Sequence, residues 1–131
     1  MRFAIIGAGM IAEFHARAIR AMPGAELAAV YARRDEAARD FAARHDCCAF
    51  SDLDALLADP GIDIVTICTP SGAHLEPVEA AARAGKHVIC EKPLEVTSER
   101  VDRMIEACQA AGVTLAGIFP RRFNAATRRL K

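Results

Sequence analysis

The sequence predicts an α/β fold: a doubly wound, mostly parallel sheet with helices on both faces. Two observations predict it. Short apolar, strand-like runs alternate with helical segments along the whole chain, and turns containing Gly or Pro separate them. Right-handed crossovers between parallel strands then place helices on both faces of one sheet.

The strands are predicted from short apolar runs that end at turn residues. DIVTIC (63–68) is rich in β-branched residues with few polar breaks, as expected of a strand covered on both faces. The six runs, in chain order, are 2–6, 26–31, 49–50, 63–68, 87–90 and 113–119.

The helices are predicted from apolar side chains at helical spacing and from residues that favour helix ends. One face of the first helix carries Ile11, Phe14, His15, Ala18 and Ile19. Residues suited to helix ends are Asp35, Ser51 and Thr97 or Ser98 as N-caps, and Gly85 and Gly112 as stops. The expected helices are 10–21, 35–45, 51–57, 74–84 and 97–111.

Composition excludes several classes of protein. A chain of 131 residues with 53% apolar and 26% charged residues fits one globular domain rather than a disordered segment. The 17 basic and 17 acidic residues balance, so no overall field attracts nucleic acid or a membrane surface. Five basic residues and no acids lie in 121–131, and we interpret them as a solvated helix end rather than a nucleic-acid arm.

The five cysteines form no CxxC pair and no zinc-like spacing with His, so we expect free thiols, a reducing cytoplasm and no metal. The N-terminus superficially resembles a signal peptide, but its apolar stretch ends at Glu13. No apolar run approaches the ~20 residues of a membrane span.

Ligands of doubly wound sheets bind beyond the carboxyl ends of the strands. The first such place, GAGMIA (7–12), follows a strand, opens a helix and matches G-x-G-x-x-G/A. Gly7 permits the tight turn, Gly9 lets a pyrophosphate approach the backbone, and the helix N-terminus attracts its charge. The predicted cofactor-binding residues here are Gly7, Ala8, Gly9, Met10 and Ile11. The alternative is a tight turn without a ligand.

After the second strand, the position where an acid would bind the ribose of NAD falls on Ala32, followed by Arg33 and Arg34. Guanidinium groups bind phosphate in a bidentate manner, so these residues favour the 2′-phosphate of NADP, with NAD as second choice. The alternative is a pair of exposed arginines beside Asp35 and Glu36.

Two further strand ends carry candidate residues. Thr69 and Pro70 lead out of the fourth strand and could line the dinucleotide, and His74 follows as a cofactor contact or, more commonly for such a His, a packing residue. After the fifth strand, Lys92 is expected to point into the same crevice, fixed by Pro93, with Glu91 orienting Lys92 or binding ribose.

These motifs together resemble the Gfo/Idh/MocA family of NAD(P)-dependent oxidoreductases over 1–131. The resemblance implies a Rossmann fold and a catalytic role for Lys92, near the nicotinamide and the reacting hydroxyl of a sugar, polyol or related substrate. It divides the chain into a dinucleotide-binding domain, 1–120, and the start of a passage, 121–131, to a C-terminal substrate domain absent here.

The resemblance places the acid–base pair and the oligomer interface in that absent domain. We therefore expect this chain to bind cofactor without turnover, as a monomer or weak dimer. A stand-alone nucleotide-binding or sensing module is the alternative, and an S-adenosylmethionine-dependent methyltransferase is a third interpretation.

Overall fold

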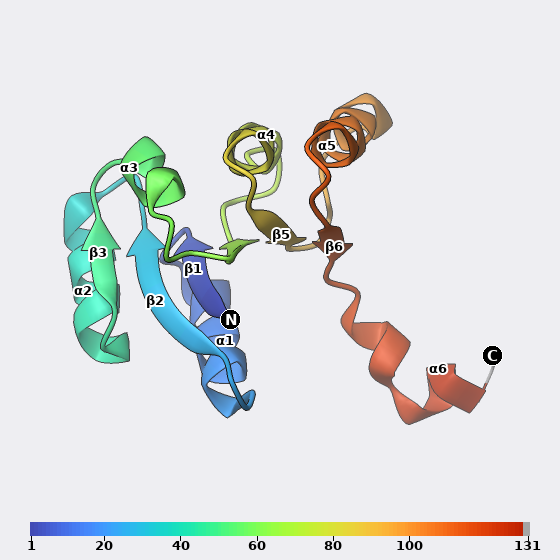
Figure 1. The fold of residues 1–131 in the computed structure, drawn as a ribbon. Helices are drawn as coiled ribbons and strands as arrows, with labels where there is room; N and C mark the ends of the chain where they lie inside the picture. The colour runs from blue at the N-terminus through green and yellow to red at the C-terminus, as the bar shows by residue number, and fades with distance from the viewer. Residues whose placement is uncertain (130–131) are drawn as a thin grey trace.

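The computed structural model describes residues 1–129, which form one parallel sheet with helices on both faces (Figure 1). The sheet has six strands in the order β3-β2-β1-β4-β5-β6. The strands are β1 (Arg2–Ile6), β2 (Glu26–Tyr31), β3 (Cys48–Phe50), β4 (Ile64–Ile67), β5 (His87–Cys90) and β6 (Leu115–Gly117). The helices are α1 (Met10–Ala21), α2 (Asp35–His45), α3 (Leu53–Ala58), α4 (Leu75–Arg83), α5 (Ser98–Ala110), the 3-10 helix η1 (Pro120–Phe123) and α6 (Ala125–Arg129).

The helices cover the two faces of the sheet in separate groups (Figure 1). Helices α1 and α2 pack on one face, over a core that includes Phe3, Ile5 and Phe41. Helices α3, α4 and α5 pack on the other face, over a second core that includes Leu56 and Met104. The strands of the sheet centre are therefore buried on both sides, which explains their nearly continuous apolar runs.

Strand register aligns the ends of the four central strands. Ile6 of β1 pairs with both Tyr31 of β2 and Ile67 of β4, and Ile67 pairs with Cys90 of β5. The residues that follow these strands therefore form a row along the carboxyl ends of the strands. The strand order reverses its direction at β1, which lies between β2 and β4, so the carboxyl end of β1 is the topological switch point.

The predicted fold class is confirmed, and so is the existence of all six strands and five helices. The ends differ at several positions. Arg34 is the N-cap of α2 and Asp35 its first helical residue, while Asp52 caps α3 by accepting a hydrogen bond from the Asp54 amide. The predictions that Asp35 and Ser51 are the caps are wrong, because the backbone turns into helix one residue away from each.

Other predicted helix ends are confirmed. Thr97 caps α5 by accepting a hydrogen bond from the Arg100 amide. Gly85 and Gly112 follow α4 and α5 with φ of +72° and +67°, the left-handed conformation that ends helices. The last strand is shorter than expected, Leu115–Gly117 instead of 113–119.

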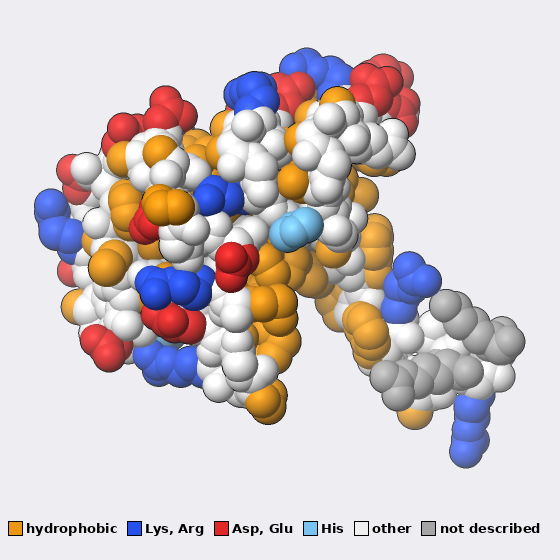
Figure 2. Space-filling model, viewed as in Figure 1, with side chains coloured by type: hydrophobic (Ala, Val, Ile, Leu, Met, Phe, Trp, Pro, Cys, Tyr) orange, Lys and Arg blue, Asp and Glu red, His pale blue; other side chains and the backbone are white. Residues whose placement is uncertain are grey.

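An arm formed by η1 and α6 extends from the edge strand β6, away from the sheet (Figure 1). Figure 2 shows hydrophobic side chains on both sides of the gap between this arm and the main body. Leu130 and Lys131, at the end of the predicted passage, lie outside the described residues. No helix within residues 1–129 is both long enough and apolar enough to cross a membrane.

Candidate functional site

The glycine turn lies in the centre of the row formed by the strand ends. Gly7 adopts φ +104°, and its amide donates a hydrogen bond to the Tyr31 carbonyl at 2.7 Å. A β-carbon on Gly7 would lie 2.7 Å from the Cys68 carbonyl oxygen, so only glycine allows β1 and β4 to end this close together. The turn thereby directs the chain into α1 at the switch point.

Gly9 borders open space. It is the N-cap of α1, and no side chain caps the helix there. Apart from the two adjacent residues in the chain, no protein atom lies within 4 Å of a β-carbon built on Gly9. Met10 is exposed, whereas Ala8 and Ile11 are partly buried. This cradle, at the positive end of a helix with unpaired amides, fits a pyrophosphate group.

At the end of β2, Ala32 is buried while Arg33 and Arg34 are exposed. Arg34 occupies the N-cap position of α2, but its side chain makes no capping hydrogen bond. Neither guanidinium has an ion-pair partner within 4.0 Å among residues 1–129. Both groups are therefore accessible to an anionic ligand.

The loop after β4 is bonded internally. The Thr69 hydroxyl donates to the Ala73 carbonyl at 2.8 Å, and Pro70 is exposed. His74 is 1% exposed, with Nε2 2.9 Å from the Thr69 carbonyl and Nδ1 3.0 Å from the carbonyls of Pro93 and Leu94. The ring thus joins this loop to the one after β5, as a packing residue does. Contact of His74 with a cofactor stays a prediction.

The loop after β5 presents Lys92 and Pro93 to solvent and turns Glu91 inward. The Lys92–Pro93 peptide bond is cis. Glu91 Oε2 accepts a hydrogen bond from the Lys92 amide at 2.9 Å, which fits the expected orienting role. The other carboxylate oxygen lies 2.9 Å from His15 Nε2 on α1, so Glu91 faces the interior.

Two features beneath these loops were missed by the sequence interpretation. His15, placed on the inner face of the first helix, binds both Glu91 and the hydroxyl of Thr66 in β4. Glu95 was not singled out at all. The sequence could have indicated His15, because it is a polar residue on an otherwise apolar helix face. Glu95 lies in a loop, where no sequence motif marks it.

Glu95 links the loop after β4 to the loop after β5. Its fully buried carboxylate accepts hydrogen bonds from the amides of His74, Leu75 and Val96 and from the Arg100 guanidinium. Burial alone would raise the pKa of Glu95, but Arg100 and the three amides outweigh it and lower the pKa to about 2. The carboxylate therefore serves as a charged cap for the N-terminus of α4.

The thiols near the site are unreactive. All five cysteines are free, as predicted. Burial raises the pKa of Cys68 to about 12 and has the same effect on Cys90, so neither supplies a thiolate nucleophile near neutral pH. Across residues 1–129, no group of three or more His, Cys, Asp and Glu side chains is arranged to hold a metal ion.

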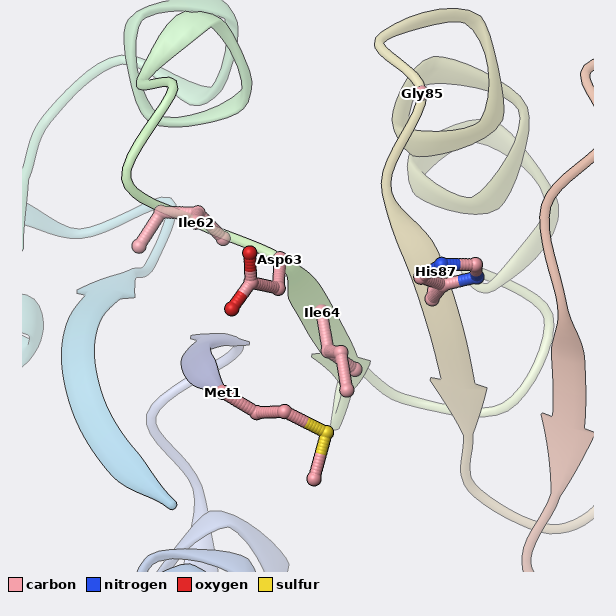
Figure 3. Close-up of a pocket in the computed structure, with 6 residues that line it drawn as sticks. All are labelled: Met1, Ile62, Asp63, Ile64, Gly85 and His87. Carbon is pink, nitrogen blue, oxygen red and sulfur yellow. The ribbon is translucent and has the colours of Figure 1, made fainter. Parts of the chain in front are cut away.

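An open pocket of about 460 Å³ lies at the opposite edge of the sheet (Figure 3). It is lined by Met1, Ile62, Asp63, Ile64, Gly85 and His87. The Asp63 carboxylate already accepts a hydrogen bond from the Arg2 amide at 2.7 Å. Because it borders the amino ends of β1, β4 and β5, the pocket contains none of the predicted site residues.

Comparisons with known proteins agree with this arrangement. A family model described as an oxidoreductase family with an NAD-binding Rossmann fold matches residues 1–119. The chain is 38% identical over 132 residues to myo-inositol 2-dehydrogenase of Thermotoga maritima, covering 100% of this chain and 40% of that protein. It is 39% identical over 116 residues to scyllo-inositol 2-dehydrogenase (NADP(+)) of Bacillus subtilis, covering 88% and 35%.

A solved structure is similarly close. The WlbA dehydrogenase from Bordetella pertussis, in complex with NADH and UDP-GlcNAcA, has a TM-score of 0.94 and 35% identity, covering 99% of this chain and 40% of that one. The chain spans 35% to 40% of the length of these three proteins. The match of fold, strand-end motifs and family model shows that this chain belongs to the Gfo/Idh/MocA oxidoreductase family and comprises its NAD-binding Rossmann domain.

Proposed function

We propose that this domain binds NADP(H) at the carboxyl ends of its strands and serves an oxidoreductase that acts on a sugar or polyol. The cradle at Gly9 carries the proposal: open space lies beside an uncapped helix N-terminus, two residues after a glycine that no other residue can replace without a clash. The relatives named as inositol dehydrogenases support the substrate class.

The preference for NADP rests on Arg33 and Arg34. Both are exposed, free of ion pairs with residues 1–129, and follow the strand next to the glycine turn. A 2′-phosphate at this position would accept charge-assisted hydrogen bonds from one or both guanidinium groups. The hydroxyl of NAD offers no comparable charge, so the arginines distinguish the two cofactors.

Lys92 is proposed as the catalytic residue. When bound, the nicotinamide cofactor supplies or accepts the hydride that interconverts a hydroxyl and a carbonyl. Lys92 is exposed at the end of β5, and its backbone is held by Glu91. An ammonium placed beside the substrate oxygen donates a hydrogen bond and stabilises the negative charge that develops on it.

Substrate turnover needs more than this lysine. General acid–base groups typically contribute ~10²–10⁴ in rate. Glu91, the nearest carboxylate in sequence, is buried and already bonded to His15 and to the Lys92 amide. We therefore propose that the 131-residue chain binds cofactor and leaves substrate unconverted.

The test is a titration of this chain with NADPH and NADH, followed by calorimetry or nicotinamide fluorescence. We expect tighter binding of NADPH. Gly9→Val is the matched control, because its side chain would enter only the space assigned to the pyrophosphate. Absence of binding by both cofactors would overturn the proposal, and binding of S-adenosylmethionine instead would favour a methyltransferase.

A further inference from the structure

A buried polar network lies directly beneath the Lys92 loop and connects three elements. The side chains of His15, on α1, and Glu91, after β5, are 12% and 8% exposed. His15 Nε2 lies 2.9 Å from Glu91 Oε1, and its Nδ1 lies 2.8 Å from Thr66 Oγ1 in β4. Both ring nitrogens are thus engaged, one by a side chain of β4 and the other by the residue that follows β5.

With Glu91 ionised, the protons in this network have two consistent arrangements. With a neutral ring, the Thr66 hydroxyl donates to Nδ1 and the Nε2–H donates to Glu91. With a doubly protonated ring, Nδ1–H donates to Thr66, whose hydroxyl is then free to donate to Cys68 Sγ at 3.3 Å. The Nε2–H donates to the Glu91 carboxylate in both arrangements, so this contact persists in either protonation state.

Glu91 divides its carboxylate between two donors. Oε1 faces the His15 ring, and Oε2 accepts from the amide of Lys92 at 2.9 Å. The ring therefore limits the rotation of the carboxylate, and the carboxylate fixes the amide. His15 lies on the helix that begins at the glycine turn, about one and two-thirds helical turns beyond Gly9.

We propose that His15 is a positioning residue for Lys92: acting through Glu91, it fixes the end of β5 against α1, so that the lysine and the glycine turn keep a constant separation. The functional part of this assignment rests on the proposed role of Lys92. The positioning of the Lys92 loop by His15 and Glu91 does not depend on that role.

A second His–Glu pair shows that α1 does not depend on His15 for its attachment. His45 of α2 has Nε2 2.7 Å from Glu13 Oε2, and Arg44 binds the other oxygen of Glu13. This pair joins α1 to α2 and makes no contact with the Lys92 loop. It supplies a matched control of the same chemistry, with its carboxylate on the same helix as His15.

The test compares His15→Gln, His15→Asn and His45→Gln in the 131-residue chain by NMR, with the backbone amide of Lys92 as the probe. The amide nitrogen of Gln reaches about as far as Nε2 of His and retains a donor for Glu91, whereas that of Asn falls short. We expect the Lys92 amide proton to stay downfield in H15Q and H45Q and to move upfield in H15N.

The same variants are then titrated with NADPH. We expect H15N to weaken binding roughly 2- to 10-fold, the range of one lost hydrogen bond, and H15Q to bind as the unchanged chain does. A Lys92 amide that responds alike in all three variants overturns the assignment. If the unchanged chain binds no cofactor, the proposed function fails and the amide comparison alone decides the role of His15.

Should H15N not fold, His15→Met replaces it. Methionine has about the length of Gln but carries no N–H for Glu91, so it removes the contact that H15Q retains. A Lys92 amide that moves upfield in H15M supports the assignment, and one that stays in place overturns it.

Discussion

Gly7 faces Cys68 so closely that a β-carbon on the glycine would lie 2.7 Å from the carbonyl oxygen of the cysteine. Two residues along the chain, the corresponding position on Gly9 meets no atom beyond its chain neighbours within 4 Å. One glycine of the turn is therefore required by the fold itself, and the other leaves open space beside the N-terminus of α1, where we propose that the pyrophosphate binds.

Substitutions at these two glycines should affect different properties, cofactor binding at Gly9 and stability at Gly7. Gly9→Val should abolish NADPH binding and leave the melting temperature unchanged. Gly7→Ala should lower the free energy of unfolding by about 1–3 kcal/mol or more, through a strained φ and the clash with Cys68. Thermal melts and cofactor titrations measure both effects.

Gly24→Ala is the control for the backbone conformation. Gly24 has φ +77° but open space around its β-carbon position, so it reports the cost of φ alone. Equal destabilisation by Gly7→Ala and Gly24→Ala would contradict the importance of the close approach to Cys68.

Arg33 and Arg34 should determine cofactor choice. Replacing either by Ala should raise the Kd for NADPH roughly 10- to 100-fold, because a charge-assisted hydrogen bond to phosphate is lost. Binding of NADH should change little. Fluorescence titration of both nucleotides measures this, with Arg39→Ala on the exposed side of α2 as the matched control. Parallel losses for NADPH and NADH would show that the arginines do not bind the 2′-phosphate.

Glu95 should make the chain sensitive to acid. Its pKa falls from an ordinary 4.5 to about 2 in the folded chain, so the folded state favours the carboxylate. This stabilisation is complete above about pH 4.5 and is lost as pH falls toward 2. Glu95→Gln should flatten the acid limb of the pH–stability curve and lower the free energy of unfolding near neutral pH by roughly 2–4 kcal/mol.

Glu106→Gln, on the exposed side of α5, is the control for Glu95. Urea unfolding between pH 7 and about pH 3 compares the two variants with the unchanged chain. An acid limb that keeps its slope in Glu95→Gln would assign acid unfolding to other carboxyl groups.

The cysteines should differ in their accessibility to alkylation. Cys48 is exposed, whereas Cys68, Cys90 and Cys108 are buried, and burial raises the pKa of the half-buried Cys47 to about 11. At about pH 8, iodoacetamide should modify Cys48 first and the other four only on unfolding, since the thiolate is the reacting species. Mass spectrometry of peptides checks the order, and early labelling of Cys68 would contradict its burial beneath the glycine turn.

The sequence predicted the fold well because its signals were local. Apolar runs such as DIVTIC and stop residues such as Gly85 determine strands and helix ends within a few positions of themselves. Cap positions were less predictable: Asp35 and Ser51 both suit a helix cap, but the caps are their neighbours Arg34 and Asp52. The helices after β6 have no apolar periodicity that would have indicated them.

The support of the candidate site was not predictable for a different reason. Glu91 and His15 are 76 positions apart, and Thr66 and His15 are 51 apart. Such contacts depend on the register that brings β4 and β5 beneath α1, which no local pattern records. The loop motifs were visible in the sequence, whereas the side chains that hold them became visible only in the folded chain.

The His74 ring lies between the carbonyls of Thr69 and Pro93, so contacts within the chain itself link the two loops that border the site. Loops linked in this way lose little conformational entropy when a nucleotide binds. Association should then proceed as a single kinetic step, with a rate that increases linearly with nucleotide concentration and reaches no plateau from a slow loop closure. The chain would then distinguish nucleotides by how well each fits the existing shape of these two loops, since the loops do not rearrange around the ligand.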